Sequence, residues 1–368
     1  MSRSTLLSGL SPVGHIDVMT MQRFSDKGLL QEGQAGLSLS TAGMQNDSKA
    51  VSKIHDAVGS QLERDAIGGF FELEFPSAKD TPYPNAKEFQ SGRAAFLALL
   101  QAGRPRRVWM PYYICSTMLD SLRQADIDVA FYHIDNRFQL AEDIRLKDRE
   151  WLVYVNYFGI RTQYARSLLS RFDPASLVID SSQALFSPPL DCLATVYSPR
   201  KFLGIPDGGW LISSLPILDP KVTDDGSFER SMSLLKRGAF SAEEAYADHQ
   251  KAERLLFHQE PKKMSHLTRR MLSGIDYQET CRIRNRNFAA LHAQLNHCNA
   301  LLLDPAEVNG ALCYPLLTQK AGLREYLIKK RIFVPTYWKD VLELVSPSDL
   351  ETHLVQELIP LPCDQRYG

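Results

Sequence analysis

The sequence predicts an α/β protein with a mainly parallel sheet in a large domain and a small α+β domain at the C-terminal end. From residue 67 to residue 212, short apolar segments alternate with segments whose apolar residues recur at helical spacing. The segment 151–156 is almost wholly apolar, which is typical of a parallel strand covered on both faces. A chain of 368 residues has room for both domains.

The expected elements follow one another in order along the chain. Ser91 is a good N-cap for a helix that Gly103 and Pro105 end. Further helices are expected at residues 118–124, 163–172 and 323–330. Strands are expected at residues 108–110, 129–134, 151–156, 177–180, 193–197, 210–212, 312–317 and 332–334. The stretch from about 225 to 300 is more helical and charged.

The composition changes along the chain and predicts three parts. Residues 1–65 are rich in Ser, Gly, Gln and Asp and follow no sustained period, so we expect a poorly ordered N-terminal extension. Within it, residues 52–62 have the spacing of a short helix. The large α/β domain is expected at residues 66–260 and the small C-terminal domain at residues 261–368.

The composition also argues against several classes of function. The net charge is −1, so neither nucleic acid nor an anionic membrane is expected as a partner. The six cysteines include no Cys-x-x-Cys pair, and the histidines lack metal-ligand spacing, so we expect no metal site and no disulfide framework. No apolar run approaches the roughly 20 residues of a membrane span, and the start lacks a signal-peptide pattern. The expected location is cytoplasmic.

The first candidate site is Ser91-Gly92-Arg93, at the start of a predicted helix. Free backbone N–H groups and the helix dipole make a helix start an anion site, and a glycine there lets a phosphate approach the backbone. An ordinary helix cap is the alternative interpretation, since Ser is a preferred N-cap residue.

The second candidate site is Asp180 with Gln183, at the end of the strand 177–180. A carboxylate in this place can pair with the nitrogen of a pyridine cofactor and keep the ring protonated. Gln183 would reach the ring hydroxyl if the turn is tight. A turn or N-cap aspartate is the alternative.

The third candidate site is Lys201, which follows the strand 193–197 and precedes a turn at Gly208 and Gly209. A lysine that forms a Schiff base needs a fixed position, partial loss of solvent and cationic neighbours. Lys201 is therefore the candidate catalytic residue. An exposed basic turn is the alternative.

The three sites follow one another in the chain order of fold-type I enzymes that use pyridoxal 5'-phosphate (PLP), and their residues resemble the DegT family of nucleotide-sugar aminotransferases. The stretch 91–95 resembles the family's phosphate turn, with Arg93 in place of a threonine. Asp180 and Gln183 resemble its Asp-x-x-Gln segment. Lys201 precedes a Gly-Gly turn and a strand, as the family's lysine does.

The resemblance covers the chain from about residue 67 to its end and implies the fold-type I architecture. It implies PLP on Lys201, Asp180 on the ring nitrogen, Gln183 near the ring hydroxyl, and the phosphate at Gly92 and Arg93. It also implies a homodimer with active sites at the subunit interface. The implied reaction moves an amino group from glutamate to a nucleotide-linked keto sugar, in amino sugar and polysaccharide biosynthesis. Lys201 would move the proton between the substrate and cofactor carbons.

Four features depart from the family pattern. The serine that the family has upstream of its lysine is out of register here, so the resemblance implies Ser198, three residues before Lys201, as the cofactor contact, with Thr195 as the alternative. The ring-stacking aromatic falls near residues 114–115, where the chain has none, so Tyr113 or Tyr112 is the expected substitute. The segment that reaches the partner subunit's phosphate has no clear copy, and Arg269 or Arg270 would supply the cation there. The last ten residues resemble a family stretch that precedes a final helix, which leaves a truncated chain and a shortened branch open.

These departures leave other functions open. One is a degenerate, non-catalytic family member that acts as a binding or assembly partner. The other is a different fold-type I reaction, such as dehydration of a keto sugar or desulfuration. Lys201 argues against the dehydratase branch, in which a histidine replaces that lysine, and no cysteine lies in an obvious mobile-loop motif.

Overall fold

A computed structural model describes residues 69–367 of the chain. The chain divides into two compact units, residues 1–72 and residues 73–368, and all elements described below belong to the second unit. The helix expected at residues 52–62 lies outside the described residues. The predicted boundaries at residues 65 and 260 stay predictions.

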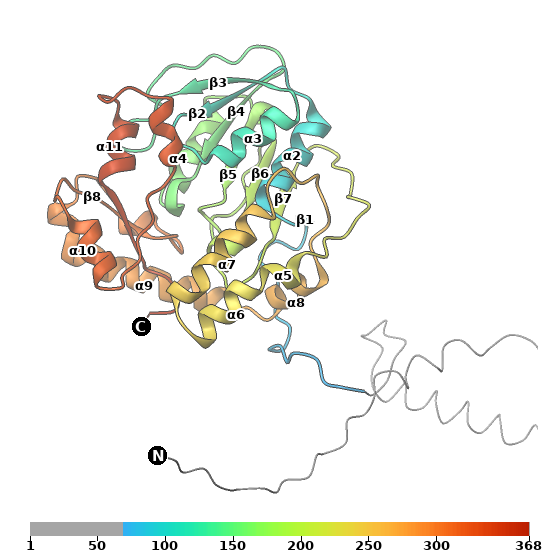
Figure 1. The fold of residues 1–368 in the computed structure, drawn as a ribbon. Coiled ribbons are helices and arrows are strands. Elements are labelled where there is room, and N and C mark those ends of the chain that lie inside the picture. The colour runs from blue at the N-terminus through green and yellow to red at the C-terminus, as the bar shows by residue number, and fades with distance from the viewer. Residues whose placement is uncertain (1–68, 368) are drawn as a thin grey trace, which may run out of the picture. The chain divides into compact units, whose positions relative to one another are not determined.

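A seven-stranded sheet forms the centre of the second unit (Figure 1). Its strands are, in spatial order, β1 (Lys87–Phe89), β7 (Gly209–Ser213), β6 (Ala194–Tyr197), β5 (Leu177–Ser181), β4 (Glu150–Val155), β2 (Arg107–Pro111) and β3 (Asp128–Tyr132). Within this sheet β7 is antiparallel to both neighbours, and the other neighbouring strands are parallel. The predicted α/β class with a mainly parallel sheet is therefore confirmed.

The central strands place the carboxyl ends of the sheet at one edge. Strands β4, β5 and β6 are buried along their whole length, because their mostly apolar side chains pack on both faces of the sheet. Their register pairs Val155 with Asp180 and Ser181 with Tyr197, so these three strands end together. Ligands of open α/β sheets bind at this edge.

The helices of the first half of the unit follow the strands. Helix α2 (Gly92–Gly103) contacts β1, β6 and β7, and α3 (Ser116–Gln124) packs against α2. A side chain at Gly103 would collide with Trp151, because an ideal Cβ there lies 2.3 Å from the Trp151 ring. Helix α4 (Thr162–Ser167) is shorter than predicted and continues as a 3-10 turn.

Five helices occupy the stretch that the sequence marks as helical. They are α5 (Ser227–Arg230), α6 (Met232–Ala239), α7 (Ala242–Arg254), α8 (His266–Ser273) and α9 (Tyr277–Leu295). Figure 1 shows α5, α6 and α7 side by side near one end of the sheet, and these three helices contact one another.

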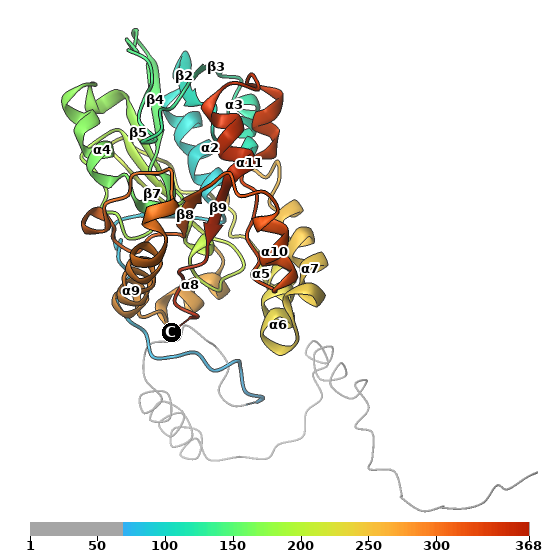
Figure 2. The same ribbon diagram turned by 90° about the vertical axis from the view of Figure 1, so that its left-hand side faces the viewer.

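The C-terminal part contains a small second sheet. Strands β8 (Tyr314–Leu317) and β9 (Leu358–Leu361) pair antiparallel, with α10 (Leu323–Lys329) and α11 (Leu350–Glu357) nearby (Figure 2). The strand predicted at 332–334 is wrong, and β9 takes the place beside β8. The reason is local: the Ile332 N–H donates to the Leu327 carbonyl at the end of α10, and Pro335 has no N–H to offer a sheet.

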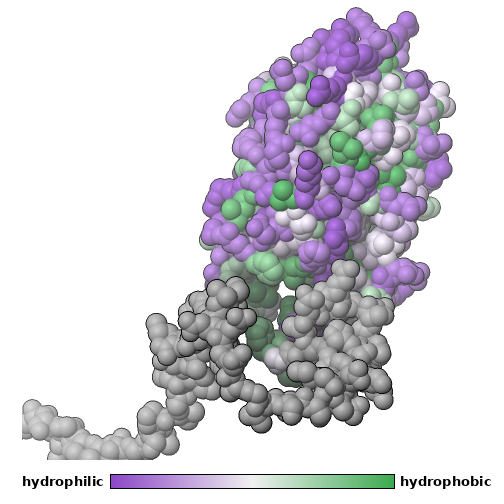
Figure 3. All heavy atoms as spheres, turned by 90° about the vertical axis from the view of Figure 1, so that its right-hand side faces the viewer, coloured by the Kyte–Doolittle hydropathy of each residue, from purple (hydrophilic) through white to green (hydrophobic). Residues whose placement is uncertain are grey.

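One face of the described part is mainly hydrophilic, as is usual for a protein surface. Figure 3 shows that hydrophilic residues predominate on the uncovered upper part of one face, with hydrophobic residues scattered between them. Among residues 69–367, no helix combines the length and apolarity that crossing a membrane requires.

Candidate active site

A cavity of about 570 Å³ lies at the carboxyl ends of the parallel strands. It is lined by residues that follow four different strands: Gly92 after β1, Cys115 after β2, Asp180 at the end of β5, and Lys201 after β6. Seven of the eight predicted site residues line it, namely Ser91, Gly92, Arg93, Asp180, Gln183, Ser198 and Lys201. The fold therefore brings together residues that lie up to 110 positions apart in the sequence.

The start of α2 forms one end of this cavity. The Ser91 hydroxyl caps the helix by accepting a hydrogen bond from the Ala94 N–H at 3.2 Å. An ideal Cβ on Gly92 would lie 3.3 Å from the Ser198 Cβ and 3.4 Å from the Tyr197 carbonyl oxygen. The missing side chain thus leaves a space between the helix start and the turn after β6, with backbone N–H groups directed towards it.

Arg93 supplies an unsatisfied cation at this end. Its side chain is 13% exposed, and its Nη1 atom is buried without a hydrogen-bond partner. The guanidinium lies 4.7 Å from the centre of the Phe257 ring, and its Nη2 is 3.8 Å from a carboxylate oxygen of Glu253. Burial lowers the pKa of Arg93, and the nearby Arg200 adds to this effect. A buried cationic donor of this kind favours an anion as its partner.

Arg200 and Glu253 form a two-point ion pair beside Arg93. The Arg200 Nη2 donates to Glu253 Oε2 at 2.9 Å, and Nη1 donates to the other oxygen. Burial acts to raise the pKa of Glu253, but the hydrogen bond and charge of Arg200 outweigh it and lower this pKa to about 2. Burial likewise acts to lower the pKa of Arg200, and the bond to Glu253 outweighs it, so that this pKa is raised. Both groups are therefore charged at neutral pH.

Asp180 and Gln183 are held in a tight turn at the end of β5. The Asp180 side chain is nearly buried, and its Oδ1 accepts a hydrogen bond from the Ser182 N–H at 2.8 Å. The Gln183 Oε1 accepts from the Phe158 N–H at 3.1 Å. Because that bond identifies the oxygen end of the amide, Nε2 is the end that can donate to a ligand.

Lys201 ends a 3-10 turn, Pro199–Lys201, directly after β6. Its backbone N–H donates to the Ser198 carbonyl at 3.1 Å, and its side chain is exposed at the cavity. The chain then passes close to the start of α2, where an ideal Cβ on Gly209 would lie 2.2 Å from the carbonyl carbon of Ser91. Only a glycine permits this approach, which keeps the lysine turn next to the helix start.

A buried polar cluster fixes the loop that follows Lys201. Asp207 is fully buried and accepts hydrogen bonds from the hydroxyl of Ser227 and from the guanidinium of Arg230. The Thr268 hydroxyl, on α8, donates to the other oxygen of Asp207. The loop is therefore tied to two helices through one carboxylate.

Tyr113 lies outside the cavity lining. Its side chain is fully buried, with ring centres 4.6 Å from Trp338 and 5.8 Å from Tyr157, and its hydroxyl has no hydrogen-bond partner. Ile114 and Cys115 line the cavity in its place, and the alternative candidate, Tyr112, lines it no more than Tyr113 does. A ring-stacking role for Tyr113 stays a prediction that this placement does not support.

Arg269 and Arg270 also lie elsewhere in this chain. Arg269 is paired with Glu88, and the Arg270 guanidinium lies 5.9 Å from the centre of the Phe75 ring. Neither lines the cavity.

Several cavity residues were not predicted from the sequence. His249, Glu253 and Phe257 come from α7 and the segment after it, and Tyr337 comes from the C-terminal part. No spacing pattern marks these residues, because each reaches the cavity through packing between distant segments. Arg200 could have been found from its position next to Lys201.

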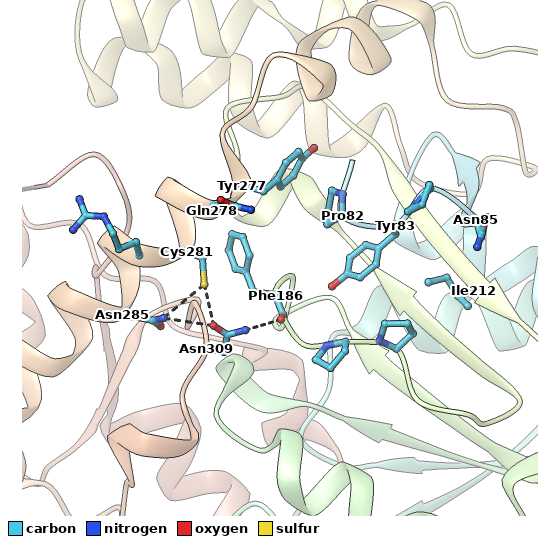
Figure 4. Close-up of a pocket in the computed structure, with 14 residues that line it drawn as sticks. Pro82, Tyr83, Asn85, Phe186, Ile212, Tyr277, Gln278, Cys281, Asn285 and Asn309 are labelled. Carbon is cyan, nitrogen blue, oxygen red and sulfur yellow. Dashed lines mark hydrogen bonds between the residues drawn. The ribbon is translucent and has the colours of Figure 1, made fainter. Parts of the chain in front are cut away.

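A larger depression, of about 780 Å³, lies between the segment 82–85 and α9 (Figure 4). Half of its lining residues are proline or aromatic. The side chains of Cys281, Asn285 and Asn309 bind one another, and Asn309 donates to the Phe186 carbonyl at 3.0 Å. Burial raises the pKa of the Cys281 thiol, which keeps it neutral. The depression thus lacks an unpaired acid or a nucleophile, and the smaller cavity is the candidate active site.

The described part of the chain was also compared with the requirements of a metal site. Within residues 69–367, no group of three or more His, Cys, Asp or Glu side chains is placed to hold a metal ion.

Comparisons with known proteins give matches in structure only. No protein-family model matches the sequence, and no curated protein matches it. DesI, solved in the presence of its TDP-sugar product, is 17% identical, with 88% of this chain and 86% of that chain covered and a TM-score of 0.54. The sugar aminotransferase CalS13 from Micromonospora echinospora is 13% identical, with coverage of 77% and 84% and a TM-score of 0.52.

NtdA from Bacillus subtilis, solved with the cofactor PMP, is 11% identical, with coverage of 88% and 78% and a TM-score of 0.51. Identities this low establish a shared fold and nothing finer. The chain therefore has the fold of the sugar aminotransferases, which confirms the predicted fold-type I architecture.

Proposed function

We propose that this protein is a PLP-dependent aminotransferase that moves an amino group from an amino acid, glutamate in the first instance, to a nucleotide-linked keto sugar. The observation that carries the proposal is a single cavity that joins an anion site, a strand-end carboxylate and a lysine on a fixed turn. The shared fold supports it, because DesI was solved with a TDP-sugar product and NtdA with PMP.

The phosphate end of the cavity fits such a cofactor. The start of α2 with its free backbone N–H groups, the space at Gly92 and Ser198 all border this end of the cavity. The buried Nη1 of Arg93 lacks a partner, which a phosphate oxygen would provide. Arg93 would then hold the phosphate with a charge-assisted hydrogen bond, while Glu253 keeps Arg200 in place beside it.

The ring end of the cavity fits as well. Asp180 would accept a hydrogen bond from the protonated ring nitrogen, because its carboxylate lies at the carboxyl end of β5 and lines the cavity. The Nε2 of Gln183 would donate a hydrogen bond to the ring hydroxyl, since its Oε1 already accepts one from the Phe158 N–H. When bound, the cofactor supplies an electron sink for the carbon that loses a proton, and the ion pair with Asp180 strengthens that sink.

Lys201 is the group that would hold the cofactor and move the proton. Its Nζ would form the covalent bond to the cofactor and, once released by the amino donor, would carry the proton between the two reacting carbons.

The C-terminal part would exclude water from the other side of the cavity. Leu312, Tyr337 and Trp338 present apolar surface to the cavity, opposite the charged wall. A dry wall strengthens the electrostatic contacts of the reacting groups. The sugar of the substrate would pack against this wall.

The homodimer predicted from the family resemblance is part of the same proposal. Five large apolar side chains are exposed on α5, α6, α7 and the short connection between α6 and α7, namely Phe228, Met232, Leu235, Phe240 and Tyr246. An exposed group of this size is typical of a surface that another chain covers. Sedimentation of the purified protein should give a dimer, and Leu235→Glu should shift it towards monomer.

The cofactor site can be tested directly on the full chain. PLP is added, the adduct is reduced with borohydride, and the modified peptide is mapped by mass. A pyridoxyl group on Lys201 that Lys201→Ala abolishes would support the proposal, as would loss of the yellow colour on addition of glutamate. A folded protein that gives no adduct would refute the enzyme and favour the alternative, a non-catalytic binding or assembly partner.

A further inference from the structure

Arg284, in the middle of α9, is a buried arginine whose guanidinium donates hydrogen bonds to backbone carbonyls. It is 2% exposed. Its Nη2 donates to the Phe202 carbonyl at 3.0 Å, and its Nη1 donates to the carbonyls of Ala311 and Leu312 at 2.9 and 3.3 Å. Its guanidinium also lies 4.8 Å from the centre of the Phe202 ring. One side chain therefore joins the residue after Lys201 to a segment of the C-terminal part.

Both joined segments reach the cavity. Phe202 directly follows Lys201, and both Lys201 and Leu312 line the cavity. The Leu312 N–H donates to the Phe158 carbonyl at 2.9 Å, and the Phe158 N–H in turn donates to Gln183. A chain of hydrogen bonds thus runs from Gln183 through Phe158, Leu312 and Arg284 to Phe202, the residue after Lys201.

This arrangement is costly for stability. Among the described residues, no carboxylate lies within 4.0 Å of the Arg284 guanidinium, and its Nε is buried without a partner. Burial accordingly lowers the pKa of Arg284. An apolar side chain of similar volume would often be neutral or stabilising at such a buried position. A buried, incompletely satisfied cation is better explained by what it positions than by the stability it adds.

A second donor acts on the same carbonyl. The Gln365 Nε2 donates to the Phe202 carbonyl at 2.9 Å, so two side chains from different segments fix one backbone oxygen. The Gln365 Oε1 is buried and has no hydrogen-bond partner. The carbonyl is therefore restrained from the α9 side and from the C-terminal segment at once.

We propose that Arg284 is a positioning residue: by binding the Phe202 carbonyl and the 311–312 segment together, it holds the Lys201 turn at a set distance from the Gln183 wall of the cavity. Its link to cofactor chemistry rests on the proposed function. The positioning itself concerns the chain alone and can be measured without any ligand.

The first measurement is amide hydrogen exchange on the cofactor-free full chain with Arg284→Met, which keeps the length of the side chain and removes its donors. Loss of two or three charge-assisted bonds should speed exchange in residues 202–208 about tenfold or more. Exchange in β4 and β5 should stay unchanged. Arg282→Met, on the exposed side of the same helix, should change neither region. Gln365→Ala should give a smaller increase in the same residues.

The second measurement is PLP binding at a temperature where all variants are folded. Arg284→Met should raise the dissociation constant for PLP and slow the covalent attachment to Lys201 by about tenfold, with Arg284→Lys in between. Unchanged exchange in residues 202–208, or an equal rise across the whole fold, would overturn the positioning role. Local loosening in Arg284→Met, together with a wild-type chain that fails to bind PLP, would support the positioning role and refute the proposed function.

Discussion

Arg200 and Glu253 line the cavity together and come from two different elements. Arg200 precedes the lysine on the turn after β6, and Glu253 belongs to α7. Their two-point ion pair ties the lysine turn to a helix 53 residues further along the chain. The same carboxylate lies 3.8 Å from Arg93. One acidic group of α7 thereby balances two cations of the anion site.

Glu253→Gln should change the pH dependence of stability. The pKa of Glu253 is about 2 in the folded chain and about 4.5 when unfolded, so the pair stabilises the fold above pH 4.5 and this contribution is lost as pH falls towards 2. The difference in unfolding free energy between wild type and Glu253→Gln should be roughly 2–3 kcal/mol at pH 7 and shrink below pH 4.5. Urea unfolding at pH 7, 5, 4 and 3 measures it.

Glu243→Gln is the matched control, because Glu243 lies on the same helix in an exposed pair with Arg331. Solvent screens such a pair, and its removal should change stability little at any of these pH values. If the difference in unfolding free energy between wild type and Glu253→Gln stayed constant between pH 7 and pH 3, Arg200 would not lower the pKa of Glu253 as described.

Gly92→Ala should weaken phosphate binding and leave the fold intact. Gly92 is the first residue of α2, where alanine is well tolerated, but its Cβ would enter the space between the helix start and Ser198. Inorganic phosphate and PLP should both bind at least about tenfold more weakly, since a displaced oxygen loses a charge-assisted bond. Isothermal titration gives both constants.

Gly238→Ala serves as the control for this substitution, because a Cβ there meets nothing within 4 Å. It should leave both dissociation constants unchanged. Equal phosphate affinities for wild type and Gly92→Ala would place the anion site elsewhere.

The strand-end residues of the site could be predicted because their signals are local. The predicted strand 177–180 is apolar up to Asp180, so the acid stands out at its end. Ser91 precedes a mainly apolar helical segment. Lys201 could be found from its place between a strand and a Gly-Gly turn. In each case the chemistry and the element boundary lie within a few residues of each other.

The rest of the site depends on contacts between distant segments, which no local pattern records. Glu253 lies on a polar helix whose charged residues look like an ordinary solvated face until Arg200 is placed beside it. Strand β9 contains Pro360 and was missed, because proline is unusual in strands, yet β9 pairs with β8 throughout. Tyr113 was predicted from sequence register alone, and the chain turns that ring into the core.

Asp180→Asn should separate cofactor binding from turnover. Asparagine keeps an oxygen to accept the Ser182 N–H, so the turn at the end of β5 is retained. It cannot form an ion pair with a protonated ring nitrogen, and the electron sink is weakened. PLP should still attach to Lys201, while the rate of amino transfer should fall roughly 100-fold or more, as when a preorganised electrostatic contact is removed. Stopped-flow absorbance with glutamate measures this rate.

The borohydride-trapped adduct on Lys201 checks that Asp180→Asn still carries cofactor. A variant that traps PLP normally and also transfers amino groups at the wild-type rate would show that Asp180 does not face the ring nitrogen. A variant that cannot trap PLP would instead assign Asp180 to the shape of the turn.

Arg93→Met should show how much of the phosphate affinity comes from the unpartnered cation. The buried Nη1 has no acceptor among residues 69–367, so its removal relieves an unsatisfied donor and also takes away a charge-assisted contact to a phosphate. The unliganded protein should therefore keep its stability, while PLP should bind about ten- to a hundredfold more weakly. Arg93→Lys should recover part of the affinity, because an ammonium keeps the charge without the planar fork. Arg123→Met, on an exposed pair of α3, should change neither quantity, and equal PLP affinity in Arg93→Met and wild type would remove Arg93 from the phosphate site.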